Sequence, residues 1–153
     1  MLYSIVGDIT PRQLGVTEIL AGLTNDSINV VTAPAIAAEQ LQWASRLDHM
    51  STDVAGIGIG GLVLASPRLA SLPADAYAAL VDTGRLAGEA LTLRIRREDA
   101  AAFERLKARM TTYSATPEER EQWAHLFRET ATRLRGTTFD AAVFDAAVGY
   151  GDH

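Results

Sequence analysis

The chain is organised around residues Leu14–Trp43, which read LGVTEILAGLTNDSINVVTAPAIAAEQLQW. Apolar residues recur with helical spacing at the start of this segment and predict a short helix. The cluster Asn25–Ser27 predicts a turn, because its short polar side chains hydrogen-bond to their own backbone. The β-branched run Ile28–Val31 predicts a buried strand. Pro34 then suits the first turn of a second helix, where its missing N–H leaves no hydrogen bond unmade.

The junction Thr32–Pro34 is the first candidate for a functional site. A strand that ends at a helix N-terminus is where α/β proteins commonly bind their ligands. Thr32 supplies a hydroxyl there, and Ala33 supplies backbone groups. Trp43, which follows the second helix, is expected first in the core, with ligand contact as the alternative.

The remaining pattern predicts an α/β fold in which a small, mixed sheet of about four or five strands is flanked by helices. Strands are expected at Leu2–Val6, after Met50 and within Val54–Ala65, and Thr111–Ser114 is expected to be a short strand or an extended link. One long helix, from about Pro73 to about Arg109, dominates the prediction. By length the whole chain, 1–153, is expected to be a single domain.

The long helix carries apolar residues at alternating steps of three and four. Gly84 and Gly88 interrupt it and indicate either a kink or the close approach of another element. A short helix opened by Ser66-Pro67 is expected to precede it. Two further helices, Pro117–Leu134 and Asp140–Val148, are expected near the C-terminus, the first of them capped by Thr116.

Composition narrows the function classes. The net charge of −5 argues against a nucleic-acid partner or an anionic membrane surface. The absence of cysteine excludes disulfides and thiolate metal sites. No apolar run has membrane-spanning length, and the start MLYSIVGD lacks the basic region and cleavage site of a signal peptide.

Motifs for catalysis or cofactor binding are weak. The run Gly56–Gly61 has neither the spacing nor the following helix of a phosphate loop, and a strand with close backbone approach is the preferred interpretation. The three histidines lack metal-ligand spacing. No catalytic residue, metal or cofactor is therefore predicted; a pairing of His49 with Asp48 or Asp53 is the remaining enzyme alternative.

The ordered series L-G-V-T-E-I-L, I-N-V-V-T-A-P and A-A-E-Q-L-Q-W resembles the substrate-binding proteins of tripartite ATP-independent periplasmic (TRAP) transporters. Gly61–Ser66, Ser71–Asp75 and Arg97–Asp99 extend the likeness over nearly the whole chain, which corresponds to the C-terminal half of a family member. The resemblance implies one lobe of a periplasmic-binding-protein clamshell, without its N-terminal lobe. It also implies capture of a small, organic-acid-like solute for membrane permease subunits, with no chemistry on the solute and hence no enzyme. The location would be periplasmic, or cytoplasmic for a stand-alone protein.

The resemblance also suggests which residues line the cleft. The candidate ligand-binding residues are Ser4, Asp8, Thr32, Ala33, Pro34, Gln40 and Trp43. The family's carboxylate-binding Arg is missing from the first strand, Ala33 stands where many members have Asn, and Arg12 lies off the pattern. Because an Arg–carboxylate clamp supplies energy and orientation, its loss predicts a more apolar pocket or a ligand other than a simple carboxylate.

Two other function classes stay open. A lone lobe would leave part of the apolar stripe of its long helix uncovered, and could act as a structural module that forms a homodimer through it. A small α/β enzyme is the third class.

Overall fold

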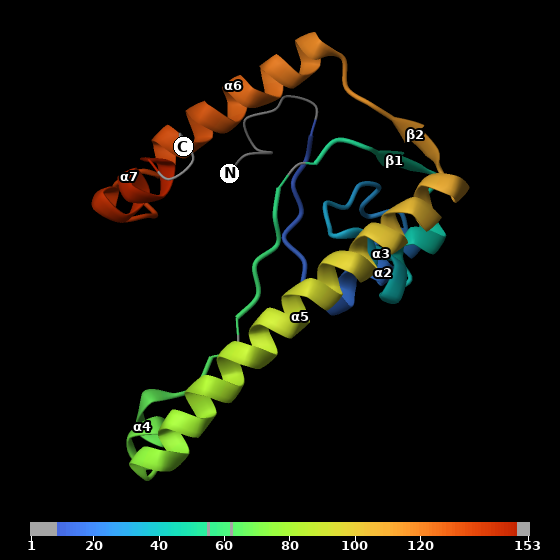
Figure 1. The fold of residues 1–153 in the computed structure, drawn as a ribbon. Helices are drawn as coiled ribbons and strands as arrows, with labels where there is room; N and C mark the ends of the chain where they lie inside the picture. Colours follow the sequence, from blue (N-terminus) through green and yellow to red (C-terminus); the bar gives the residue numbers. More distant parts are fainter. Residues whose placement is uncertain (1–8, 55, 62, 150–153) are drawn as a thin grey trace. The chain divides into compact units, whose positions relative to one another are not determined.

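The computed structural model describes residues 9–54, 56–61 and 63–149 (Figure 1). The chain divides into two compact units, which are described one at a time. The larger unit is Gly15–Tyr113, and the smaller unit combines Met1–Leu14 with Ser114–His153.

The larger unit begins with the predicted helix and turn. A 3₁₀ turn, η1 (Val16–Glu18), leads into α2 (Ile19–Thr24). The Glu18 carboxylate accepts the Gly15 N–H at 2.7 Å, which satisfies one donor that the first turn leaves free. In the following turn the Ser27 N–H donates to Asn25 Oδ1 at 3.1 Å. Both elements are therefore confirmed.

The sheet is smaller than predicted. Strand β1 (His49–Ser51) pairs in parallel with β2 (Thr111–Tyr113), and His49 lies opposite Thr111. Strand β2 confirms the strand expected from Thr111, and β1 begins at His49, slightly before the strand entry expected after Met50. With the helices around them, the two strands confirm the α/β class. The described residues form a sheet of two strands, not four or five.

Two predicted strands are wrong. Ile28–Val31 has no strand partner, and Val30 is 76% exposed. The described part of Val54–Ala65 is not a strand either, and Ile59 is 93% exposed. A β-branched or apolar run favours extended backbone, but it forms a strand only where a neighbour supplies hydrogen bonds. The strand expected at Leu2–Val6 lies outside the described residues.

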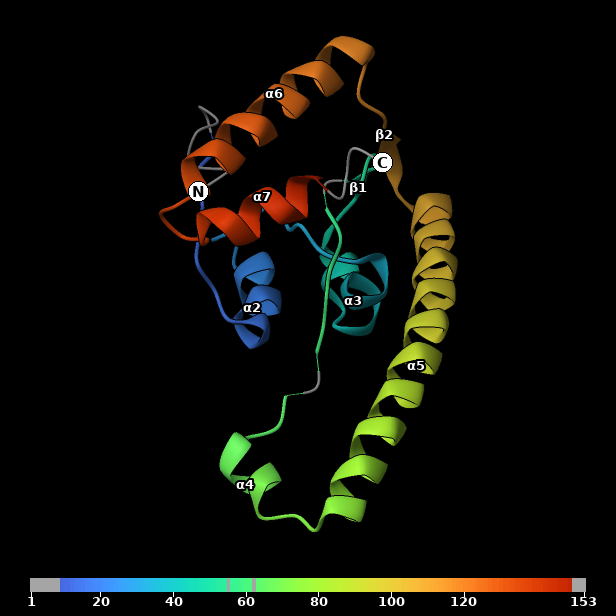
Figure 2. The ribbon, with the colours of Figure 1, turned by 60° about the vertical axis from the view of Figure 1, so that its left-hand side comes forward.

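The predicted long helix is confirmed as α5 (Ala74–Arg109), whose 36 residues correspond to about 54 Å. It runs through Gly84 and Gly88 without interruption. The short helix α4 (Ser66–Ala70) precedes it, with Pro67 in the first turn as expected. Figure 2 shows α4 near the N-terminal end of α5 and α3 (Ala35–Gln40) beside the C-terminal half.

The core of the larger unit gathers around the C-terminal half of α5. Helix α3 packs against α5 and against the 3₁₀ helix η2 (Trp43–Arg46), which also contacts α2. The buried apolar residues come from these elements and are Leu23, Trp43, Ala44, Ala102 and Leu106. Each short element thus derives its stability from tertiary packing rather than from its own length.

The smaller unit contains the two predicted C-terminal helices, α6 (Pro117–Leu134) and α7 (Ala141–Gly149). Thr116 and Glu119 form a reciprocal capping box at the start of α6. Gly136 follows the end of α6 with φ of +71°, in the left-handed region that favours glycine. Arg135 then binds Asp145 of α7 through two hydrogen bonds of 2.6 Å.

Candidate functional site

The junction Thr32–Pro34 is an exposed, irregular segment that leads directly into α3. Pro34 occupies the N-cap position with φ −58° and ψ 145°, one residue before the helix begins. Its carbonyl accepts the Ala38 N–H at 3.1 Å, which starts the helical hydrogen bonds. The proline thus fixes the direction in which the chain enters α3.

The N-terminus of α3 is occupied by a carboxylate from α5. The Ile36 N–H donates to Asp99 Oδ1 at 2.9 Å, and Asp99 is half-buried. Backbone N–H groups at a helix start carry partial positive charge, so a carboxylate there satisfies a donor and favours the helix. An acidic ligand would therefore meet Asp99 at this helix end instead of a free N–H group.

An ion pair holds the other end of α3 on α5. Arg105 Nε and Nη2 donate to the two Glu39 carboxylate oxygens at 2.8 and 2.5 Å. This hydrogen bonding by the guanidinium lowers the pKa of Glu39 below its ordinary value. Further along, Arg109 Nη2 donates to the Ala44 carbonyl at 2.7 Å. Three side chains of α5 therefore fix the segment from the junction to η2.

Those predicted ligand residues that the structure describes differ in their exposure to solvent. Thr32, Ala33 and Pro34 are exposed, and Gln40 is exposed at the far end of α3. Trp43 is only 5% exposed and belongs to the core, as first expected. Ser4 and Asp8, expected on the opposite wall, lie outside the described residues.

Two residues lie near the junction that were not among the predicted ligand residues. Asp99 reaches it from a distant part of the chain, and Gly58 passes beside Pro34: a Cβ on Gly58 would lie 3.6 Å from Pro34 Cγ. The resemblance did draw attention to Arg97–Asp99, but no sequence signal indicated that Asp99 caps α3. The glycine run was predicted to be a strand with close backbone approach; its described part is not a strand, and a Cβ at Gly58 would make only an ordinary contact with the Pro34 side chain.

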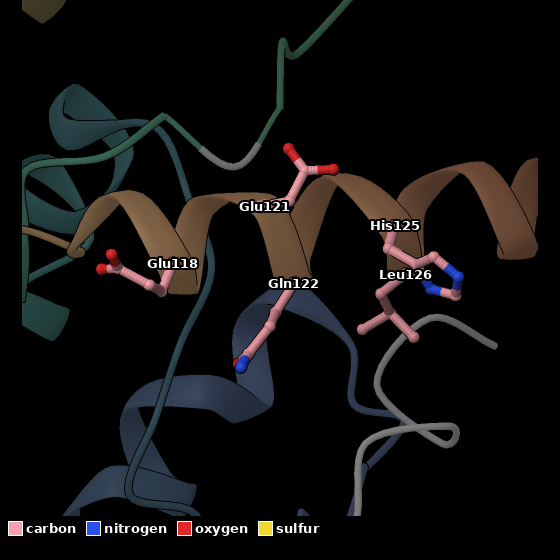
Figure 3. Close-up of a pocket in the computed structure, with 5 residues that line it drawn as sticks. All are labelled: Glu118, Glu121, Gln122, His125 and Leu126. Atoms are coloured by element: carbon pink, nitrogen blue, oxygen red, sulfur yellow. The ribbon is translucent and has the colours of Figure 1, made fainter.

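Two shallow hollows on the described surface lie elsewhere. One follows α6 and is lined by Glu118, Glu121, Gln122, His125 and Leu126 (Figure 3). All five come from one helix, and Figure 3 shows Glu118 and Glu121 pointing away from His125. The other hollow lies along α5 and is lined by Gly88, Glu89, Thr92 and Leu93. Each of these two hollows is lined by residues of a single helix.

Features of metal sites and membrane spans are absent from the described ranges. These residues contain no group of three or more His, Asp or Glu side chains placed to hold a metal ion. No helix among them combines the length and apolarity needed to cross a bilayer. His49, the residue of the enzyme alternative, is exposed on β1.

The candidate site thus consists of the junction, its Asp99 cap and the Glu39–Arg105 pair. Comparison with protein-family models, with curated proteins and with solved structures gives no significant match to this chain.

Proposed function

We propose that this chain is the solute-binding component of a TRAP-type transporter, in the form of its C-terminal lobe. It would capture a small, organic-acid-like solute in the periplasm and deliver it to membrane permease subunits. No chemical change of the solute is part of the proposal. The proposal is supported by the ordered sequence resemblance. The segments that carry this resemblance form α2, the junction that leads into α3, then α4 and the long helix α5, in the order that the resemblance implies.

One observation carries the assignment of the site. Asp99 of α5 accepts a hydrogen bond from the start of α3, and Arg105 of α5 forms an ion pair near its end. These contacts hold α3, and with it the exposed junction Thr32–Pro34, against the long helix α5. A binding wall must be rigid if closure of two lobes is to bury a ligand, because ordering a mobile wall would reduce the affinity. The contacts of α3 with Asp99 and Arg105 support this proposal, because they hold the helix that the junction enters.

The chemistry of the junction favours a particular kind of contact. The exposed side chains of Ala33 and Pro34 are apolar, and Asp99 already occupies the helix end beside them. A carboxylate directed at this helix end would be repelled by Asp99. We therefore propose that the solute presents an apolar or hydroxyl-bearing part to this wall and that any acid group of the solute is bound by other residues.

The test is a thermal-shift screen of the full chain with small organic acids and their neutral amides. A true ligand raises the melting temperature, by an amount equivalent to about 2.7 kcal/mol when its concentration is about 100 times Kd. Ala33→Leu should abolish the shift, and Ala90→Leu, an exposed alanine on α5, should preserve it. The proposal is wrong if no compound stabilises the chain, or if both variants respond alike.

A second candidate, a dimerising structural module, is favoured by a separate observation. Apolar side chains along the N-terminal half of α5 are exposed, as the apolar spacing of the sequence implies for a lone lobe. This surface is independent of the junction, so either function can hold without the other.

A further inference from the structure

The chain on both sides of α3 is anchored to the core of the larger unit. Before α3, the Ile28 N–H donates to the carbonyl of the buried Gly22 at 3.2 Å. After α3, Ala44 is buried, and Arg109 of α5 donates to its carbonyl at 2.7 Å. Residues 29–41 lie between these two anchors and contain the junction and α3. We call this segment the strap.

The strap is held less firmly than its anchors. None of its residues is buried: the α3 residues from Ala35 to Glu39 are half-buried, and the junction Thr32–Pro34 is exposed. Gln42, with φ of 62° in the left-handed region, follows α3 and separates the strap from η2. Segments with few buried apolar side chains open while the rest of a protein remains folded. The strap is therefore the part of the larger unit that we expect to open first.

Two side chains of α5 hold α3, one near each end. Asp99 accepts the Ile36 N–H at 2.9 Å, and Arg105 donates to Glu39 at 2.8 Å. Ala102 lies on α5 between them, about one helical turn from each, and it is 0% exposed. Because α3 packs on α5 between these contacts, it lies over Ala102.

We propose that the strap opens and closes over α5 as a single unit. In the closed form, Asp99 and Arg105 hold the two ends of α3. In the open form both contacts are broken, α3 is unwound and Ala102 is accessible to solvent. The contacts open together because α3 has only six residues, so loss of its first turn leaves less than a second turn, which is not stable alone.

The anchors confine the opening to residues 29–41, because Ile28 and Ala44 keep their own contacts with the core. The open form is a minor one, about 0.1–10% of the molecules, so the closed form still holds the junction against α5. The inference concerns the chain without a ligand and does not depend on the proposed solute-binding function.

Thiol labelling of an Ala102→Cys variant with iodoacetamide tests the opening, and the chain has no cysteine of its own to interfere. The closed strap shields this thiol, so it should react about 10–1,000-fold more slowly than the thiol of Ala90→Cys, at an exposed position of α5. Its labelling rate should change little in low concentrations of urea, because a short segment exposes little surface when it opens.

Two outcomes of the labelling experiment would overturn the proposal. If the Ala102→Cys thiol reacts as fast as the Ala90→Cys thiol, the strap does not cover α5. If its labelling depends on urea as steeply as global unfolding does, the strap does not open by itself.

Amide hydrogen exchange tests whether the two contacts open together, in the chain without an added cysteine. The N–H groups of Ala38 and Leu41 form helical hydrogen bonds towards the two ends of α3. Asp99→Ala should speed the exchange of both amides by the same factor, about 5–30-fold. Arg105→Met should speed both by a smaller common factor, about two- to five-fold, because its ion pair is exposed.

Arg94→Met is the matched control for Arg105→Met. Arg94 forms an exposed ion pair of 2.7 Å with Glu98 within α5, and its loss should leave the exchange of the α3 amides unchanged. If each variant accelerates only the amides next to the altered contact, α3 frays from two independent ends and the single unit is refuted. Equal effects of Arg94→Met and Arg105→Met would also refute the proposal.

Discussion

Removal of the Asp99 carboxylate should release the N-terminus of α3. Asp99 Oδ1 accepts the Ile36 N–H at 2.9 Å and is the contact by which α5 holds the helix end next to the junction. In the Asp99→Ala variant, this half-buried backbone donor loses its acceptor. Because α3 has only six residues, it cannot persist without tertiary contacts, and its first turn should fray.

The expected loss of stability follows from the kind of contact that Asp99→Ala removes. Loss of a capping side chain costs about 1 kcal/mol, and a hydrogen bond to a charged group is worth about 1.5–3 kcal/mol. We therefore expect Asp99→Ala to lower the free energy of unfolding by about 1–2 kcal/mol. In a unit of roughly 100 residues, each kcal/mol lowers the melting temperature by about 4–8 °C.

Urea unfolding followed by circular dichroism would measure this loss, and amide hydrogen exchange would locate it. Asp99→Asn keeps an acceptor oxygen and should lose less than half as much stability. Asp82→Ala, at an exposed position of the same helix, is the control and should be near neutral. The reasoning fails if Asp99→Ala is no more destabilised than Asp82→Ala, or if exchange of the α3 amides is unchanged.

Four further changes test other contacts. Gly84→Ala should stabilise the α5 helix by about 1 kcal/mol in thermal unfolding, because the new Cβ meets nothing within 4 Å. Gly136→Ala should cost about 1 kcal/mol in thermal unfolding, since φ at this position is +71°. Thr116→Ala should cost about 1 kcal/mol by loss of the cap of α6, measured by helix content during urea unfolding. The pKa of Glu39 is lowered in the folded chain by hydrogen bonding to Arg105, so the stabilisation is full above the ordinary value of 4.5 and is lost as the pH falls through the folded pKa. The difference in urea midpoint between wild type and Glu39→Gln should therefore shrink below pH 4.5, and a constant difference would contradict this assignment.

Local signals were sufficient to predict the long helices α5 and α6, whereas the predicted helix after Pro34 ends at Gln40, before Leu41 and Ala44. The hydroxyl, proline and two acids at Thr116–Glu119 predicted the start of α6, and the capping box forms there. Apolar spacing predicted α5 to within a residue at its N-terminal end. A helix is stabilised by hydrogen bonds between residues four apart and by caps in the same turn, so its limits can be predicted from neighbouring residues.

The strands and the candidate site depended on distant residues. Ile28–Val31 has the composition of a strand but lacks a partner, whereas His49–Ser51 pairs with Thr111–Tyr113. Asp99 caps Ile36 across 63 positions of the chain, and Arg105 pairs with Glu39 across 66. No local pattern specifies which distant segment supplies a hydrogen bond.

The order of residues along the chain was therefore enough to locate the long helices of this protein and the apolar stripe along α5. The closure of the α3 N-terminus by Asp99 and the burial of Ala102 and Leu106 on α5 became apparent only in the folded chain. Helical hydrogen bonds form within one turn, whereas burial and caps between elements depend on which remote surfaces pack together.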